Sequence, residues 1–328
     1  MTHPTLKGIE TALFNIRPHM PETPLVRSEI FSRAFDADIW LKNETTTPIA
    51  SFKLRGALNA LIQAKEKGGI KGATTSSTGN HGQGVAYAAR LLGMPSDIFL
   101  PAKANPVKAA MIEAFGGTLH KIGRDIDEAK DASRAFAQKN GVFFVDDGDD
   151  LEVMEGAGTV GLEIARGLDK LDAVYVPVGA ANLLGGVASA VKAVHPKAKM
   201  IGVQAKGATT MHDSFHAKKM VERPVDTIAD GLTQRVAPQL AFEVMMKTAD
   251  DMLLAPDADL LRGVRAMAEC AHVLVEPAGS AALCGAWSQR AALKGKTVAL
   301  ILSGANLTTE LLQKALSMEP LIALDGVK

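Results

Sequence analysis

The stretch "ATTSSTGNHGQGVAYAARLLG", residues 73–93, changes character in its middle. It begins with β-branched and hydroxyl residues typical of a strand and ends in an Ala-rich run that predicts a helix from about Gly82 to Leu92. Three hydroxyls, two amide side chains, a histidine and three glycines fill the turn between them. Backbone N–H groups at the start of a helix bind anions, so this turn predicts a site for a carboxylate or a phosphate.

The same alternation of strand and helix continues along the chain. The β-branched runs "ADIWLKNE", "SDIFLP", "AVYVPV", "KMIGVQ" and "TVALILS" each lie close to a helical pattern. Strands without polar alternation, separated by helices, predict an α/β fold with mostly parallel sheets that helices cover on both faces. Ligands of such sheets bind at the carboxyl ends of the strands, in loops that lead into helices. Three further loops are therefore candidates for binding or catalytic residues.

The loop "IASFKLRGA", residues 49–57, contains a lysine among small and apolar residues. Ser51 is expected to cap a helix from about Phe52 to Lys67, which places Lys53 in its first turn. There the helix dipole and the apolar neighbours favour the unprotonated amine that attacks a carbonyl. A solvated lysine on a surface helix is the alternative, and the local sequence does not decide between the two.

Two more loops follow strands. "PVGAANLLGG", residues 177–186, has the strand, small-residue loop and helix that hold a phosphate at a helix dipole. It lacks the glycine spacings of dinucleotide and ATP sites, so a lone phosphate group fits better than a nucleotide. Tight packing of helix on strand is the structural alternative. In "LSGAN", Ser303 would present a neutral hydroxyl at the end of the strand "TVALIL".

Composition narrows the class of protein. Lys+Arg and Asp+Glu are balanced at 36 each and aromatic residues make up 5%, which argues against nucleic-acid and membrane partners. Cys270 and Cys284 have no clustered histidines, so buried thiols and no metal are expected. The N-terminus lacks the pattern of a secretory signal. The uncharged run 173–191 contains Pro177 and Asn182, which favours strand, loop and helix over a membrane span. A cytoplasmic protein is predicted.

Together these segments resemble the fold-type-II pyridoxal-phosphate enzymes of the threonine/serine dehydratase and serine racemase group. The resemblance runs in order from "TPL" at residue 23 through "SFKLRGA", "SSTGNHG", "GAGTVGLEI", "PVGAANLLGG" and "VEPAGSAAL" to "LSGAN" at residue 302. It implies a two-domain, tryptophan synthase β-like fold. Residues 1–70 and 148–328 would form a large cofactor-binding domain, and residues 71–147 a small mobile domain that closes over the substrate. It also implies a homodimer.

The resemblance assigns roles to the loops. Lys53 carries pyridoxal 5′-phosphate as a Schiff base, next to Phe52 in the pocket wall. Asn80 hydrogen-bonds the oxygen on the cofactor ring, and Ser303 pairs with the ring nitrogen. The phosphate cradle matches Gly179, Ala180, Ala181, Asn182 and Leu183. The loop that receives the substrate carboxylate matches Ser77, Thr78, Asn80 and His81, and Thr78 is also a catalytic candidate because racemases carry a proton-donating serine at its position.

The implied activity is that of a dehydratase, an ammonia-lyase for a small amino acid. It would convert a β-hydroxy amino acid such as threonine or serine to a 2-oxo acid and ammonia by α,β-elimination, with Lys53 removing the Cα proton. A serine- or aspartate-type racemase and a lyase for a larger substrate, such as a hydroxyectoine-derived amino acid, stay open. So does a non-catalytic protein that binds a metabolite. A β-replacement enzyme fits less well, because that group typically has threonine where His81 stands.

Three positions depart from the family pattern. The phosphate loop commonly consists of glycines, so Ala180 and Ala181 would be strained if their φ angles were positive, and Asn182 could add an amide donor. Gln204 stands where metal-binding relatives have a glutamate, and the loss of that carboxylate argues against a divalent-cation site. The extra methyl group of Thr78 would hinder the approach that a racemase serine makes.

Overall fold

The structure, a computed structural model, describes residues 3–102, 106–124 and 126–323. Its described strands form one sheet in the order β1-β2-β10-β7-β8-β9 and another in the order β5-β4-β3-β6. Every neighbouring pair is parallel except β1 and β2. The strands are β1 (Leu25–Arg27), β2 (Asp38–Asn43), β3 (Ala73–Ser76), β4 (Ser96–Leu100), β5 (Thr118–Lys121), β6 (Phe143–Phe144), β7 (Ala173–Pro177), β8 (Lys199–Ala205), β9 (Asp251–Ala255) and β10 (Thr297–Leu302).

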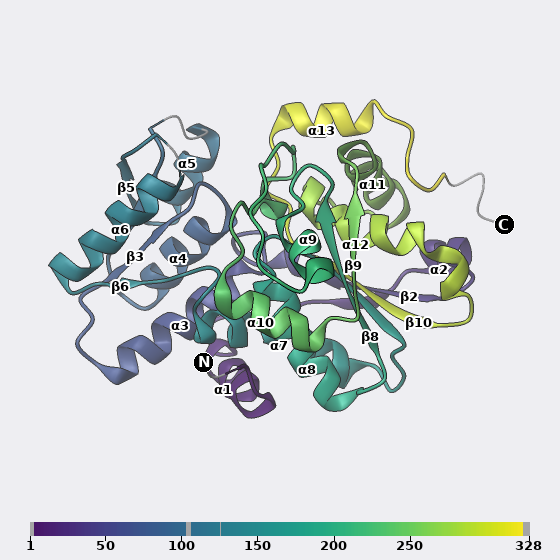
Figure 1. Cartoon of the computed structure of the whole chain (residues 1–328), viewed down its shortest axis with the longest axis horizontal. Helices are drawn as coiled ribbons and strands as arrows, with labels where there is room; N and C mark the ends of the chain where they lie inside the picture. The colour runs from purple at the N-terminus through teal and green to yellow at the C-terminus, as the bar shows by residue number, and fades with distance from the viewer. Residues whose placement is uncertain (1–2, 103–105, 125, 324–328) are drawn as a thin grey trace.

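The helices divide between the two sheets. Figure 1 shows the smaller sheet with α3 to α6 at one end of the molecule, and the larger sheet with the remaining helices at the other. The helices are α1 (Leu6–Ile16), α2 (Glu29–Phe35), α3 (Lys53–Lys67), α4 (Asn80–Leu91), α5 (Pro106–Ala114), α6 (Ile126–Asn140), α7 (Leu151–Gly167), α8 (Asn182–Val194), α9 (Thr210–Ala217), α10 (Gln239–Thr248), α11 (Asp257–Cys270), α12 (Pro277–Ser288) and α13 (Thr309–Leu316).

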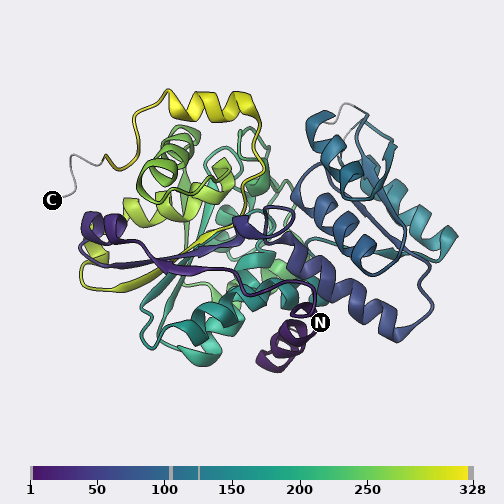
Figure 2. The ribbon, with the colours of Figure 1, turned by 180° about the vertical axis from the view of Figure 1, so that it is seen from behind.

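The larger sheet is buried on both faces. Tyr175 on β7 packs into a core that α11 and α12 cover, whereas its neighbours Val174 and Val176 pack into a second core under α7 and α8. Alternate residues of β10 divide in the same way, with Leu300 in the first core and Ile301 in the second. Figures 1 and 2 show α1 and α13 on opposite sides of this sheet. The prediction of mostly parallel sheets covered on both faces is confirmed.

A buried ion network fixes the start of α3. The Arg55 guanidinium is fully buried, and its Nε and Nη2 atoms each donate a 2.7 Å hydrogen bond, to Glu44 Oε2 and Glu163 Oε2 respectively. Lys42 Nζ lies 2.7 Å from the same Glu163 oxygen. Burial acts to raise the pKa of Glu163, but Arg55 and Lys42 outweigh it and hold that pKa at about 2. Because the network joins β2, α3 and α7, it holds the turn that begins with Lys53.

The predicted elements are present with small differences at their ends. The uncharged run at 173–191 is β7, a loop and α8, and no helix in the described part of the chain is long and apolar enough to cross a membrane. The predicted cap at Ser51 is wrong by one residue, since α3 begins at Lys53 and Phe52 holds the cap position. The backbone of Ser51 instead bridges Gly304, beyond the end of β10, while its hydroxyl accepts a 3.4 Å bond from Lys53 N.

Candidate functional site

The carboxyl end of β10 brings Lys53 beside Ser303. Phe52 N donates to Ser303 O at 3.1 Å, and Ala305 N donates to Ala50 O at 2.9 Å. These backbone bonds attach the loop before α3 to the loop after β10, as residues distant in sequence meet at the edge of a parallel sheet. The Ser303 side chain is almost buried, and its hydroxyl makes no hydrogen bond with the described residues. Two of the four predicted loops therefore meet here.

Lys53 is enclosed rather than solvated. Its side chain is 17% exposed, and Nζ lies 5.0 Å from the centre of the Phe52 ring. Both carboxylate oxygens of Asp147 lie 2.5 Å from Nζ. Burial acts to raise the pKa of Asp147, but Lys53 and then His81 lower it overall, so this carboxyl is ionised at neutral pH. Asp147 was not predicted as a site residue, because no local sequence motif marks it.

Asn80 is held by two partners on distant elements. Its Nδ2 donates to Glu276 Oε1 at 2.7 Å, and its Oδ1 accepts from Asn306 Nδ2 at 2.8 Å. Glu276 is almost fully buried, and burial raises its pKa to about 7 although Asn80, Lys108 and Lys53 oppose that rise. Glu276 lies in the segment "VEPAGSAAL", and its contact with Asn80, 196 residues away, was not predicted because no local pattern connects the two residues.

The start of α8 has the features of an anion cradle. Ala181 precedes the helix with a φ of 64° and a ψ of 8°, and no side chain caps the first turn. A Cβ on Gly179 would lie 2.7 Å from the Gly231 carbonyl oxygen, so the loop requires glycine there. Asn182 Nδ2 donates to the Asp147 carbonyl oxygen at 2.7 Å, while its buried Oδ1 has no partner among the described residues. The expected strain is confirmed at Ala181, and one amide donor of Asn182 is already engaged.

The loop before α4 presents polar groups and a second uncapped helix start. No side chain caps Gly79, and the space where its Cβ would stand is open. Ser77 and Thr78 are half-buried, and the Thr78 hydroxyl makes no hydrogen bond with the described residues. His81 differs, since its ring is buried and Nε2 lies 3.1 Å from the Val145 carbonyl oxygen. Its Nδ1 has no hydrogen-bond partner in the described part of the chain and lies 3.5 Å from Asp147 Oδ1.

These positions fit the cofactor that the resemblance implies. The uncapped start of α8 offers backbone N–H groups to a phosphate, as a helix N-terminus requires. The Ser303 hydroxyl and the Asn80 amide lie at the ends of neighbouring elements where a heterocyclic ring would need polar partners. Lys53 supplies an enclosed amine for a carbonyl group. Of the other predicted cradle residues, Ala180 is half-buried in the loop, and Leu183 is buried in the core under α7 and α8.

Gln204 replaces a carboxylate with a neutral amide. Its Oε1 accepts hydrogen bonds from Met211 N at 3.1 Å and His212 N at 3.0 Å, at the start of α9. The side chain is fully buried, and Nε2 has no partner among the described residues. Within the same residues, no group of three His, Cys, Asp or Glu side chains lies close enough together to hold a metal ion. The amide therefore serves as a cap for α9.

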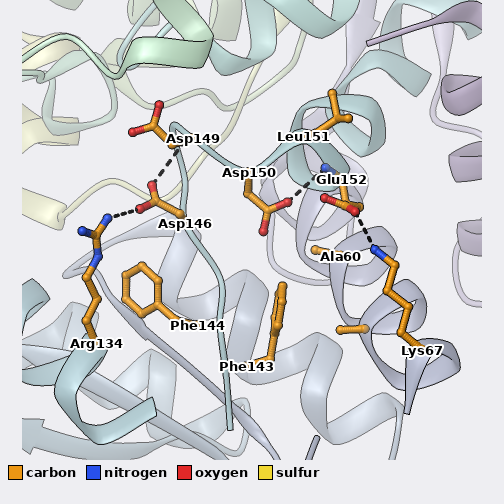
Figure 3. A pocket seen from close by; sticks show the side chains of 11 residues that line it. Ala60, Lys67, Arg134, Phe143, Phe144, Asp146, Asp149, Asp150, Leu151 and Glu152 are labelled. Carbon is orange, nitrogen blue, oxygen red and sulfur yellow. Dashed lines mark hydrogen bonds and ion pairs between the residues drawn. The ribbon is translucent and has the colours of Figure 1, made fainter. Parts of the chain in front are cut away.

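A cavity of about 540 Å³ lies next to the segment that follows β6. Figure 3 shows Asp146 in its wall, facing Arg134, with which it forms a 2.8 Å ion pair. Lys130 also pairs with Asp146, and these cations outweigh burial and hold the pKa of Asp146 at about 2. The cavity lining contains none of the predicted site residues, so this cavity is separate from the site at Lys53.

Known proteins resemble the chain over most of its length. It is 35% identical over 301 residues to an L-threonine ammonia-lyase of Geobacter sulfurreducens, which is 91% of this chain and 75% of the relative. It is 33% identical over 307 residues to the L-threonine dehydratase catabolic TdcB of Staphylococcus aureus, covering 92% and 89% of the two chains.

Solved structures share the fold. A serine racemase of maize superposes with a TM-score of 0.90 at 28% identity, covering 96% of this chain and 97% of that one. The processed form of threonine deaminase isoform 2 of Solanum lycopersicum superposes with a TM-score of 0.87 at 31% identity, covering 96% and 94%. A family model described as "Pyridoxal-phosphate dependent enzyme" matches residues 16–304. The protein therefore belongs to the family of pyridoxal-phosphate dependent enzymes.

Proposed function

We propose that the protein is an ammonia-lyase that converts a small β-hydroxy amino acid to a 2-oxo acid and ammonia by α,β-elimination. The enclosed amine of Lys53, in a loop whose backbone is bonded to Ser303, is the observation that carries this proposal. The relatives named L-threonine ammonia-lyase and L-threonine dehydratase support it at 35% and 33% identity. A substrate like threonine or serine follows from these names.

Lys53, the start of α8 and Ser303 would have different roles in cofactor binding and catalysis. Lys53 holds the cofactor through its amine, and the start of α8 from Gly179 to Leu183 holds the phosphate. Bound pyridoxal phosphate supplies a ring that accepts electrons from Cα. The released Lys53 amine takes the Cα proton. Ser303, a neutral hydroxyl, pairs with the ring nitrogen without holding it protonated as a carboxylate would, which favours prompt elimination.

Substrate binding is assigned to the loop before α4. Ser77, Thr78 and the uncapped N–H groups at Asn80 would receive the α-carboxylate, because a helix start attracts an anion. His81 contributes through its position beside Asp147 rather than through this anion site. Phe52 forms the apolar wall next to Lys53.

A racemase is the second candidate. The Thr78 hydroxyl is half-buried and makes no hydrogen bond with described residues, so it is available to donate a proton to one face of Cα. The maize serine racemase at 28% identity supports the same alternative. Its hallmark would be stereoinversion of serine at a rate comparable with elimination.

The colour of the purified protein tests the cofactor assignment. Wild-type protein with pyridoxal phosphate should absorb visible light and lose that band on treatment with borohydride. Lys53→Ala should do neither, whereas Lys65→Ala, on the exposed side of the same helix, should behave like wild type. A wild-type protein that stays colourless after reconstitution would contradict the assignment. Release of 2-oxo acid from L-serine, D-serine, L-threonine and 3-hydroxyaspartate, assayed with stereoinversion, then separates lyase from racemase.

The proposal extends to domain movement and assembly. Residues 71–147 would form the small mobile domain that closes the site, and residues 1–70 with 148–328 the large domain. Scattering profiles with and without a substrate analogue test this closure, which should reduce the radius of gyration.

A homodimer, expected from the resemblance, should give about twice the chain mass of 34.5 kDa by light scattering. Cys270 and Cys284 are buried free thiols, which supports a reducing, cytoplasmic location.

A further inference from the structure

The corner of the site next to Lys53 contains two hydrogen-bond acceptors side by side. One is the Asp147 carboxylate, whose side chain is 35% exposed and therefore within reach of a ligand. The other is His81 Nδ1, which lies 3.5 Å from Asp147 Oδ1 on a ring that is only 4% exposed. Val145 O can only accept, so Nε2 of His81 must carry the ring proton in the neutral form. Nδ1 is then an acceptor to which no group of the described residues donates.

The corner is left with a negative charge when the Lys53 amine, which pairs with Asp147, is committed to the cofactor. Burial lowers the pKa of His81 although Asp147 opposes this effect, so the ring is neutral at physiological pH. Asp146, the adjacent carboxylate, is turned to Arg134 in the wall of the neighbouring cavity (Figure 3). It also pairs with Lys130. Among the described residues, Lys53 is the lysine or arginine that pairs with Asp147.

The backbone holds Asp147 in place. Asn182 Nδ2 donates to its carbonyl oxygen at 2.7 Å. A Cβ on the next residue, Gly148, would lie 2.4 Å from Pro238 Cγ, so the chain packs closely there. Leu240 N donates to Asp149 Oδ1 at 3.0 Å two residues further on. The backbone that carries the carboxylate is therefore fixed in place before a ligand binds.

We propose that Asp147 and His81 Nδ1 form a subsite for a side-chain ammonium group, so that the preferred substrate is a β-hydroxy amino acid with a second amino group. This inference rests on the proposed function, which commits the Lys53 amine to the cofactor and to the Cα proton. An ammonium has three N–H donors, which can satisfy the carboxylate and the imidazole together. A methyl group offers no donor to either, and a side-chain carboxylate would meet a like charge.

A matched series of substrates tests the subsite. Threonine, 2,4-diamino-3-hydroxybutanoate and 3-hydroxyaspartate differ at Cγ, which is a methyl, an aminomethyl or a carboxylate group. The holoenzyme should show its highest kcat/KM with the diamino compound, about ten-fold or more above threonine, as one charge-assisted hydrogen bond provides. The value for 3-hydroxyaspartate should be the lowest.

Binding without turnover gives a second readout. Calorimetry of the holoenzyme with 2,4-diaminobutanoate and 2-aminobutanoate compares the same two side chains without a leaving hydroxyl. The diamino compound should bind about ten-fold more tightly or better. Asp147→Asn should abolish this preference, and Asp147→Glu, which keeps the charge, should retain part of it. Asp146→Asn, the neighbouring carboxylate outside the site, should keep the wild-type preference.

The outcomes separate the subsite from the proposed function. Equal affinity of wild-type protein for the two analogues, or a preference that survives in Asp147→Asn, would overturn the subsite, and the wild-type comparison decides even if a variant fails to fold. Absence of 2-oxo acid from every β-hydroxy amino acid in the series would instead overturn the lyase proposal. Calorimetry would still decide about the subsite in that case.

Discussion

Ala181 holds a backbone conformation that suits glycine better. Its φ of 64° lies in the left-handed region, where a Cβ crowds the following carbonyl oxygen. The neighbouring helix α8 needs this turn so that its first N–H groups face the site. The strain is therefore tied to the anion cradle and not spread over the loop.

Replacement of Ala181 by glycine should relieve that strain. We expect Ala181→Gly to raise the free energy of unfolding by roughly 0.5–1 kcal/mol, since the lost strain exceeds the added entropy of the unfolded chain. Urea denaturation measures the change. Ala180→Gly is the control, because Ala180 has no positive φ, and it should lower the stability by a similar amount. A destabilised Ala181→Gly protein would argue against the left-handed turn.

Because of Glu276, the free energy of unfolding should fall as the pH rises. Burial raises its pKa to about 7 from the ordinary value of 4.5. A raised carboxyl pKa means that ionisation opposes folding: the penalty is absent below pH 4.5, grows between 4.5 and 7, and is complete above 7. Glu276→Gln cannot ionise, and its amide oxygen can still accept from Asn80.

The expected effect of Glu276→Gln is up to about 3 kcal/mol of added stability at pH 8 and almost none near pH 4.5. Denaturant titrations at the two pH values measure it. Glu66→Gln, on the exposed side of α3, should match wild type at both. A variant that is no more stable than wild type at pH 8 would show that Glu276 is not held protonated.

At the scale of elements, the position of α3 depends on buried ion pairs. The sequence of the helix does not show that these charged side chains are buried. The segment 53–67 has the pattern of a surface helix with several lysines, yet Arg55 in its first turn is fully buried. Its guanidinium bonds to Glu44 after β2 and Glu163 on α7. The helix that carries Lys53 is thus positioned by ion pairs with two other elements as well as by apolar packing.

Removal of a buried member of this network should lower the free energy of unfolding much more than removal of an exposed arginine. Arg55→Ala leaves Glu163 buried with less compensation, so we expect about 3–5 kcal/mol lower stability. Arg17→Ala removes a 37% exposed guanidinium that lies 2.9 Å from the same Glu163, and should cost about 1 kcal/mol or less. Chemical denaturation of both variants provides the comparison, and equal losses would contradict the buried role of Arg55.

At the scale of the whole molecule, one acidic segment joins the two sheets. Asp146 pairs with Lys130 and Arg134 on α6, beside the smaller sheet. Asp149 accepts from Leu240 N at the start of α10, beside the larger one. Asp147, between them, contacts Lys53. A movement of residues 71–147 against the rest would therefore act directly on the lysine.

Acid should destabilise the protein through two carboxylates, Glu163 on α7 and Asp146 after β6. The pKa values of Glu163 and Asp146 are both about 2, below their ordinary values of 4.5 and 3.8. A lowered carboxyl pKa contributes stability that is complete above the ordinary value and is lost as pH falls toward 2. The melting temperature should drop between pH 4.5 and 2, in addition to the separate decrease that ionisation of Glu276 causes between pH 4.5 and 7. Glu163→Gln should have a lower melting temperature at pH 7 and a smaller drop in acid, and parallel curves for the two proteins would contradict this account.

Local patterns were sufficient for the elements, whereas the prediction for Lys53 rests on the resemblance of the whole chain. Strand, loop and helix are recognised within about twenty residues, because β-branched runs, glycines and Ala-rich segments act on their own neighbourhood. The runs at β7, β8 and β10 were predicted for this reason. Strain in the loop 179–183 was expected only if an alanine there had a positive φ, and Ala181 does. The cap at Ser51 was misplaced because a distant strand end, at Gly304, takes up its backbone.

The sequence by itself determined the parallel α/β architecture, the family and the loops that meet at the strand ends. Tertiary structure decided which groups surround the lysine. Asp147 lies 94 residues from Lys53, and Glu276 lies 196 residues from Asn80, so no local pattern connects them. The charge and the free acceptors of a site depend on burial and on which side chains meet, and both arise only when distant segments pack together. For that reason the sequence predicts a role for Lys53, while the fold places Asp147 and His81 next to it.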